Sequence, residues 1–138
     1  MVKPIILKPS FDFENQYQGQ CVLGVDEAGC GAWAGPLVTA GCYVEQSNIP
    51  ENLLKNIHDS KKISPLKRSE IFAWLTQHPA VHYSVHVVPT DEFNTLGLAA
   101  AWRHSIQTLI SDFPISIDHV LLDGNRAPAF DKPIRPII

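Results

Sequence analysis

The sequence predicts a mixed α/β domain, in which helices flank a β-sheet. Three observations support this fold class. Apolar runs rich in Val, Leu and Tyr alternate with amphipathic segments, in the order strand, strand, helix, strand, helix, strand. The 138 residues suffice for one domain with a covered sheet. A composition of 45% hydrophobic and 18% charged residues excludes both a disordered chain and a membrane-spanning one.

Two strands joined by a glycine-rich turn are predicted for residues 21–44, which read CVLGVDEAGCGAWAGPLVTAGCYV. The first apolar run reaches two adjacent carboxylates, Asp26 and Glu27, and the second run extends from Leu37 to Val44. Because successive side chains of a strand point to opposite faces, these carboxylates can share a site only where the strand ends and the chain bends. The glycines at positions 29, 31 and 35 supply a bend. We therefore expect the first strand to finish at Asp26 and Glu27.

Two amphipathic helical segments are predicted downstream. The first begins at Ser64 and the proline after it, because Ser caps free backbone amides and Pro fits the first helical turn. Its apolar residues over Leu66–Gln77 form one broad stripe, which we expect to pack on the sheet. Thr90 opens the second segment as a capping hydroxyl. Gly97 then separates a short turn from a long helix that ends near Phe113.

Two further strands are predicted from the remaining apolar runs. Residues 81–87 alternate apolar with polar side chains, which is typical of a half-buried strand. This pattern places His82 and His86 on the wetter face, where two histidines without a third ligand favour a structural role over a metal site. A short buried strand over His119–Asp123 is stopped by Gly124 and the asparagine after it.

The two ends of the chain differ from the predicted core. Residues 1–20 show no sustained period, so we interpret them as an N-terminal arm before a catalytic domain over residues 21–138. Prolines make the last residues extended, and a chain that stops on Ile137 and Ile138 is expected to end inside a strand, with the domain incomplete at its C-terminus. No early apolar run is long enough for a signal peptide or a spanning helix, so we expect a cytoplasmic protein without membrane contact.

Charge and cysteine content narrow the possible functions. The net charge of −3 argues against a typical nucleic-acid binder, which carries a basic field for phosphates. Lysines and arginines nevertheless cluster at residues 55–68 and 126–135, so either a basic rim beside a cation-filled acidic centre or an ordinary solvated surface fits the sequence. Three cysteines without a C-x-x-C pair favour reduced side chains over a disulfide framework or a zinc site.

Carboxylates close two of the predicted strands. Asp26 and Glu27 precede Gly29, and Asp123 precedes Gly124. If the two strands are neighbours in the sheet, three carboxylates converge at one edge, and their repulsion calls for a cation among them. Oxygen ligands favour Mn²⁺ or Mg²⁺ over zinc, and such a site suits phosphodiester hydrolysis. The alternative is a small binding domain in which these acids only cap turns.

Three segments of the chain resemble the bacterial ribonuclease HII family, and they occur in the family's order. The first is Gly-Val-Asp-Glu-Ala-Gly at residues 24–29, followed by Gly31 and by Ala-Gly-Pro at residues 34–36. The second is Asp-Ser-Lys-Lys-Ile-Ser at residues 59–64, and the third is Leu-Asp-Gly-Asn-Arg at residues 122–126. Three motifs at compatible separations make the resemblance specific, and it extends from about residue 22 to the last residue.

The resemblance implies an RNase H-like fold, a mixed sheet flanked by helices, and a metal-dependent endoribonuclease. The implied substrates are RNA–DNA hybrids and duplex DNA that contains ribonucleotides. Incision on the 5′ side of the ribonucleotide would leave 3′-hydroxyl and 5′-phosphate ends. The residues that match the family's catalytic ligands for Mn²⁺ or Mg²⁺ are Asp26, Glu27 and Asp123.

The resemblance also implies substrate contacts. The loop that recognises the ribose 2′-hydroxyl in the family corresponds to Gly29, Cys30 and Gly31. Positions near the substrate backbone correspond to Lys61 and Lys62, for which an ordinary solvated turn is the alternative. We interpret Asn125 and Arg126 as supporting the turn after the third carboxylate.

The chain departs from the family pattern in two places. The family has Gly-Arg-Gly where this chain has Cys30 between glycines, and Ala32-Trp33 replaces the usual Pro-Leu. Cys cannot replace the planar fork of Arg, so recognition of a 2′-hydroxyl would depend on backbone amides. Family members also continue past the point matching Ile138, with a Gly-Asp pair that supplies a fourth carboxylate and a helical segment with further substrate contacts. A second hypothesis is therefore an incomplete fragment that binds hybrid nucleic acid or metal without turnover.

Overall fold

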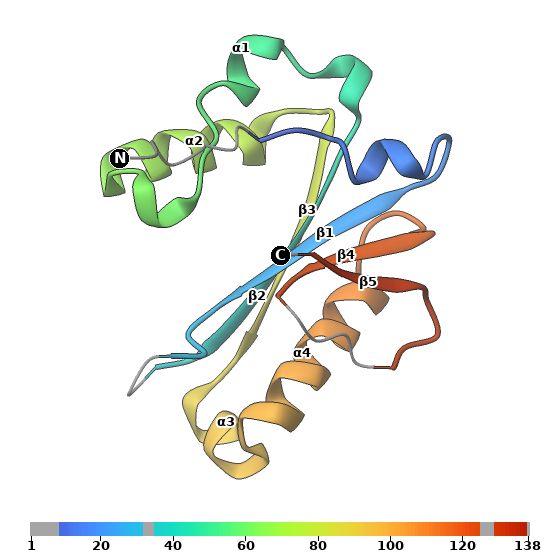
Figure 1. Ribbon diagram of the computed structural model, residues 1–138. Coiled ribbons are helices and arrows are strands. Elements are labelled where there is room, and N and C mark those ends of the chain that lie inside the picture. The colour runs from blue at the N-terminus through green and yellow to red at the C-terminus, as the bar shows by residue number, and fades with distance from the viewer. Residues whose placement is uncertain (1–8, 32–34, 125–128, 138) are drawn as a thin grey trace, which may run out of the picture. The chain divides into compact units, whose positions relative to one another are not determined.

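The computed structural model describes residues 9–31, 35–124 and 129–137, and Figure 1 shows their arrangement in helices and strands. The chain divides into two compact units. One contains Met1–Gln16 and Val44–Val81, and the other contains Tyr17–Tyr43 and His82–Ile138. Some residues on which predictions were made lie outside the described residues; these are Ala32, Trp33, Ala34, Asn125, Arg126 and Ile138.

Within the described residues, five strands form one mixed sheet, which belongs almost wholly to the second unit. The strands are β1 (Val22–Ala28), β2 (Leu37–Val44), β3 (Val81–Val88), β4 (His119–Asp123) and β5 (Ile134–Ile137). Their order in the sheet is β3-β2-β1-β4-β5. β1 and β2 form an antiparallel hairpin, whereas β4 pairs in parallel with both β1 and β5. The predicted α/β class and the predicted order of strands and helices up to β4 are confirmed.

Two helices, α3 (Thr90–Leu96) and α4 (Leu98–Ser111), follow β3. Gly97 separates them as predicted, with a φ of 75° that suits a residue without a Cβ. The predicted cap was wrong by one residue, because Pro89 occupies the N-cap position and Thr90 is already helical. None of the helices formed by the described residues has the length and apolar character needed to span a bilayer.

The hydrophobic core of the second unit lies between α4 and the centre of the sheet (Figure 1). Ile106 and Leu109 of α4 are buried against β1 and β4. The strand residues that pack with them are Leu23, Val25, Val120 and Leu122. Gly41 of β2 lies under the same helix, because a Cβ at this position would be 3.1 Å from a methyl group of Leu109. α4 therefore covers the face of the sheet that carries these side chains, which we name the α4 face.

The alternation predicted for β3 is confirmed, but the prediction of which face is wet was wrong. Val85 is 49% exposed, whereas Val88 is fully buried in a cluster with α4. His82 and His86 share the face of Val88 because side chains alternate along a strand. The ring of His86 lies 6.0 Å from the ring of His104 in α4. The histidines thus lie on the α4 face, since the position of the helix decides which face is covered.

The described residues of the first unit form short 3₁₀ turns, a one-turn α-helix and a longer α-helix. Among its described residues the helical elements are η1 (Glu14–Gln16), η2 (Gln46–Asn48), α1 (Glu51–Leu54), η3 (Ser60–Lys62) and α2 (Pro65–Gln77). The hydroxyl of Ser64 accepts a hydrogen bond from the backbone N–H of Lys67 at 3.3 Å. The predicted start of α2 is confirmed.

The prediction that α2 buries its apolar stripe was wrong. Leu66 is 73% exposed, Phe72 is 62% exposed, and no described residue of α2 is fully buried. Each residue turns a helix by about 100°, so Phe72 lies well around the helix from its neighbour Ile71. Leu66, in the first turn of α2, lies still further around the helix axis from Ile71. The apolar side chains are therefore spread over more than one face.

Candidate active site

β1 and β4 are neighbouring parallel strands, and their pairing places Asp26 beside Asp123. Val25 is the register partner of Leu122, and an aspartate is the next residue on each strand. Adjacent strands lie about 4.8 Å apart, so the two carboxylates start from neighbouring positions at one edge of the sheet. The expectation that the first strand and the strand ending at Leu122 lie side by side is confirmed.

Asp26 and Asp123 also point to the same face of the sheet. Val25 and Leu122, the residues before them, are buried on the α4 face. Because strand side chains alternate, both aspartates point away from α4. Both are exposed. The structure thus brings together two of the three predicted carboxylates on the face opposite α4.

Glu27 lies on the other face of the same strand. β1 does not end at the two carboxylates as expected but continues to Ala28, because its pairing with β2 extends that far. The register partner of Glu27 is Thr39, whose hydroxyl lies 2.6 Å from the hydroxyl of Ser105 in α4. Glu27 therefore points to the α4 face. Within the described ranges, no group of three or more His, Cys, Asp or Glu side chains could hold a metal ion.

The carboxylates nevertheless have features that suit a divalent cation. The Oδ1 atom of Asp26 accepts a hydrogen bond from the backbone N–H of Glu27 at 2.7 Å, which helps to hold this carboxylate in place two residues before the end of β1. The Oε2 atom of Glu27 is buried and has no hydrogen-bond partner. Mg²⁺ is commonly held by one or two carboxylates together with water and substrate phosphates. A pair of neighbouring aspartates fits Mg²⁺ or Mn²⁺ on donor chemistry, and the unsatisfied oxygen of Glu27 lies on the other face of the same strand.

The glycine-rich loop bends directly after β1. Gly29 has a φ of 98°, and a Cβ there would be 2.4 Å from the carbonyl oxygen of Pro36, so only glycine fits this close approach. Cys30 is half-buried and packs against the cluster of Leu37, Val88 and Ala101. Burial, the charge of Glu27 with a hydrogen bond to it, and the charge of Asp26 raise the pKa of the Cys30 thiol from 9.0 to about 11.

Lys61 and Lys62 lie on a separate turn in the first unit. Asp59 caps this turn, because its Oδ1 atom accepts a hydrogen bond from the backbone N–H of Lys61 at 3.0 Å. The guanidinium of Arg68 donates to the carbonyl oxygens of Ser60 and Ile63 at 2.9 and 2.7 Å. These bonds hold a turn on which both lysines are exposed.

The comparison with protein families decides the affiliation of the chain. The sequence model of the family described as Ribonuclease HII matches residues 23–138. The chain belongs to the ribonuclease HII family. A ribonuclease HII from Rhodococcus opacus (strain B4) is 38% identical over 117 residues, which are 85% of this chain and 50% of that protein. The chain spans about half the length of the curated relatives it matches.

Solved structures confirm the RNase H-like fold of this ribonuclease HII chain. The ribonuclease H2 from Pyrococcus horikoshii OT3 superposes with a TM-score of 0.69 at 23% identity, covering 84% of this chain and 61% of that one. Bst-RNase HIII, solved in complex with Mn²⁺, gives a TM-score of 0.60 at 22% identity, covering 86% of this chain and 41% of that one. At these identities the likeness concerns the fold alone.

One feature beside the acidic residues was missed by the sequence reasoning. Thr39 and Ser105 are fully buried, and their hydroxyls bond to each other. Thr39 stands in a strand of apolar residues and Ser105 in a helix, 66 positions apart in the ribonuclease HII chain. A hydroxyl on each element carries no signal of pairing, because only the packing of α4 on β2 brings these two together.

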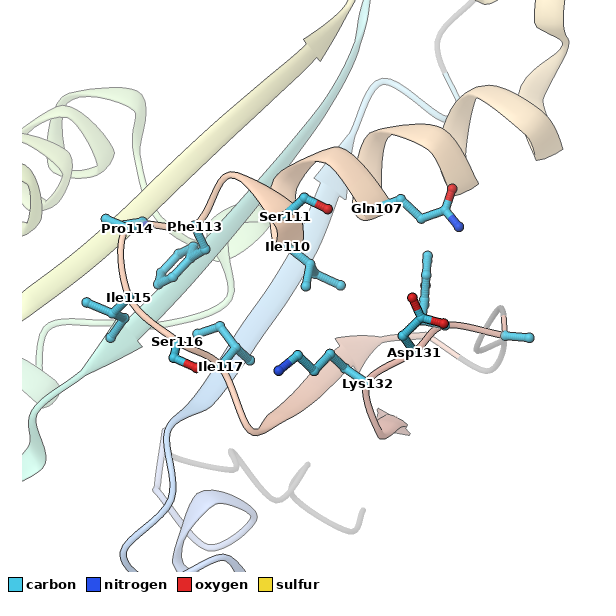
Figure 2. A pocket seen from close by; sticks show the side chains of 12 residues that line it. Gln107, Ile110, Ser111, Phe113, Pro114, Ile115, Ser116, Ile117, Asp131 and Lys132 are labelled. Carbon is cyan, nitrogen blue, oxygen red and sulfur yellow. The ribbon is translucent and has the colours of Figure 1, made fainter.

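A cavity of about 750 Å³ lies at the opposite edge of the sheet. Figure 2 shows Ile110 at the end of α4 and Phe113 just after it around the same hollow as Ile117 and Lys132. Ile117 precedes β4, whereas Asp123 is the last residue of that strand. The cavity is therefore separated from the aspartate pair by the length of β4 and is not part of the candidate active site.

Proposed function

We propose that this chain carries catalytic carboxylates of a metal-dependent endoribonuclease that hydrolyses RNA in RNA–DNA hybrids. The proposed reaction includes incision of duplex DNA on the 5′ side of an embedded ribonucleotide, with 3′-hydroxyl and 5′-phosphate ends as products. The observation that carries the proposal is the juxtaposition of Asp26 and Asp123 on neighbouring parallel strands, in a chain of the ribonuclease HII family.

Asp26 and Asp123 are proposed to hold Mn²⁺ or Mg²⁺ at the edge of the sheet where β1 and β4 end. Glu27, whose side chain points to the α4 face, is proposed as a further carboxylate that approaches the same edge from that side. Such a cation, when bound, makes water a stronger nucleophile and stabilises charge on the leaving 3′ oxygen. The chain itself holds the two aspartates in position. The ladder between β1 and β4 fixes the spacing of the two aspartates, and the backbone N–H of Glu27 holds one oxygen of Asp26.

Substrate selection is proposed for the loop after β1 and for the basic turn. The amides of Gly29–Gly31 would face the ribose 2′-hydroxyl, the group that separates RNA from DNA. This role is supported by the tight bend at Gly29 and by the inward position of Cys30, which leaves backbone rather than a long side chain at the loop surface. Lys61 and Lys62 are exposed and suit contacts with phosphates, which position a duplex without reading its sequence.

The direct test is incubation of the chain with Mn²⁺, and separately with Mg²⁺, and an end-labelled duplex that contains one ribonucleotide. We expect one cut on its 5′ side and none in the all-DNA duplex of the same sequence. Asp123→Asn should abolish cutting without loss of the folded state, measured by circular dichroism. Cutting by that variant would contradict the proposal. If only a version extended past Ile138 cuts, the 138 residues lack a required part.

A second candidate is binding of hybrid nucleic acid without turnover. Two observations favour it, namely that the chain spans about half the length of its relatives and that two rather than three carboxylates converge. It predicts salt-sensitive binding, because phosphate contacts release counterions. Fluorescence anisotropy with a labelled hybrid should then show the same affinity for the original chain and for Asp123→Asn, with no product.

A further inference from the structure

β3 is an edge strand of the sheet that the described residues form, because β2 is its one neighbour there. Its register with β2 follows from two contacts. The backbone N–H of Glu45 donates to the carbonyl oxygen of Ala80 at 2.9 Å, and in an antiparallel ladder such a bond joins directly opposite residues. Two positions further into the two strands, the rings of Tyr43 and His82 stack at 5.9 Å. The even-numbered residues of β3 therefore direct their backbone groups toward β2.

The odd-numbered residues of β3 direct their backbone groups to the outer edge, because this direction alternates along an antiparallel strand. They include Tyr83, Val85 and Val87, whereas the N–H of Val81 already donates to the carbonyl oxygen of His78. Among residues 9–31, 35–124 and 129–137, none outside the ladder forms a backbone hydrogen bond with Tyr83, Val85 or Val87. Each of the three thus offers one N–H and one C=O at the edge of the sheet.

The side chains of the same three residues are also open to solvent. Tyr83, Val85 and Val87 lie on the face opposite α4 and are 43%, 49% and 49% exposed. The eight residues of β3 include no Lys, Arg, Asp, Glu or Pro. Natural edge strands commonly carry such residues, which prevent pairing with another chain. β3 therefore lacks the features that keep an edge strand unpaired.

A second copy of β3 complements this edge. In an antiparallel pair with a two-fold axis beside Val85, this residue lies opposite its own copy, and Tyr83 lies opposite Val87 of the second copy. All the outward backbone groups of the three residues then find partners. The side chains meet as β-branched and aromatic pairs, which stabilise neighbouring strands. The ladder ends where Pro89, which has no N–H, lies opposite Val81, whose N–H is already used.

We propose that β3 is a self-association edge, through which two copies of this chain pair in antiparallel fashion and form one continuous sheet across a two-fold axis. A second copy fits this edge because the outward groups are symmetric about Val85 and because β3 has no acidic or basic residue that would repel its own copy. Asp26 and Asp123 lie on β1 and β4, and β2 separates these strands from β3. Self-association is therefore independent of the proposed cation binding.

The original chain can be tested by sedimentation equilibrium and by amide hydrogen exchange at low and high protein concentration. We expect the mass to rise toward twice that of one chain. The amides of Tyr83, Val85 and Val87 should exchange about tenfold more slowly when about nine in ten chains are paired. The amides of Ser84 and His86, which face β2, should exchange at the same rate at both concentrations. The mass of one chain at every concentration, or a higher mass without slower exchange at the three outward amides, would overturn the proposal.

The two-fold register can be tested with charges at its centre. Val85→Lys and Val85→Glu each place like charges opposite one another, so each variant alone should associate at least about tenfold more weakly than the original chain. An equimolar mixture of the two should associate about tenfold or more better than either variant alone, because unlike charges now meet. The matched control is Leu96→Lys, a substitution of an apolar residue at the end of α3 that is 42% exposed. It should leave association unchanged.

Three results with these variants would overturn the proposal. They are undiminished association of Val85→Lys, an equal loss of association in Leu96→Lys, and a mixture that associates no better than its components. Circular dichroism of each variant shows that the comparison concerns folded protein. Where a variant does not fold, the exchange rates of the original chain decide between a paired and an unpaired β3 edge.

Discussion

Asp26 and Glu27 are adjacent in the sequence, yet they lie on opposite faces of the sheet and in different surroundings. Asp26 is exposed, next to Asp123 in the strand register, and anchored by a backbone amide. Glu27 lies on the α4 face, near a neutral thiol and opposite a buried hydroxyl, and one of its oxygens has no partner. Two carboxylates of the same motif therefore have different physical tasks, because a strand alternates its side chains.

The same contrast extends across the sheet. The α4 face is dry in its centre, where Leu109 and Ile106 are 1% and 0% exposed. On the opposite face Val85 and Val87 of the edge strand β3 are each 49% exposed, whereas Leu121 in the centre of the sheet is buried. At β3, stability is therefore expected to depend on the α4 face, and cation binding is expected on the face of the aspartate pair. Each prediction below tests one side of this division.

The largest effect is expected at Asp26. Asp26→Asn should abolish cleavage, because the charge that would hold a cation is lost. The fold should stay intact, or gain less than about 1 kcal/mol, since repulsion between neighbouring carboxylates is removed. The amide oxygen of Asn can still accept the bond from the N–H of Glu27. Gel assays measure cleavage, and thermal melting measures stability. A large fall in melting temperature would contradict this prediction, because it would mean that Asp26 is needed for the fold.

The next prediction compares substitutions on the two faces by their effect on the free energy of unfolding. Leu109→Ala should lower the free energy of unfolding by about 2–5 kcal/mol, because it leaves a cavity in the core. Val85→Ala, on the exposed face of an edge strand, should change it by less than about 0.5 kcal/mol. Urea unfolding followed by circular dichroism gives both values. Similar losses for the two variants would mean that the exposed side of β3 is also covered in solution.

The surroundings of Glu27 can be tested through the two raised thiol pKa values. Burial raises the pKa of both Cys30 and Cys42 to about 11, but Glu27 contributes only at Cys30. Removal of a nearby negative charge favours the thiolate, so Glu27→Gln should lower the pKa of Cys30 and leave that of Cys42 unchanged. Each unit of decrease raises the thiolate fraction about tenfold below the pKa.

The measurement is the pH dependence of alkylation in proteins that retain a single cysteine. We expect Cys30 to be alkylated faster at a given pH in the Glu27→Gln variant than in the protein that retains Glu27. An equal increase at Cys42 would indicate a general loosening of the fold rather than a local charge effect.

The smallest effect is expected when Cys30 is replaced by arginine. A guanidinium cannot occupy the half-buried position of Cys30 beside Leu37, so it must leave the α4 face and reach solvent at the loop. Cys30→Arg should then increase the preference for a ribonucleotide over deoxyribonucleotide by about tenfold, the value of one charged hydrogen bond. Competition cleavage of two labelled duplexes measures this ratio. An unchanged ratio would show that the side chain at position 30 has no part in recognising the 2′-hydroxyl.

Local signals in the sequence determined much of this protein. The cap at Ser64, the break at Gly97 and the alternation over residues 81–87 depend on neighbours in the chain, and the structure places elements where these signals predict them. The sequence also shows that two apolar strands each lead into an acid, but only the long-range pairing of β1 with β4 made Asp26 and Asp123 neighbours.

Only the tertiary structure decided which side chains of each strand lie on the face that α4 covers. Alternation states that two sets of side chains lie on opposite faces, but it does not state which set a helix will cover. Val85 became exposed and His86 was placed beside His104 because α4 crosses one face of the sheet. Glu27 was separated from the aspartates because pairing with β2 extends β1 to Ala28. Both outcomes depend on contacts between segments far apart in the chain, which periodicity within one segment does not encode.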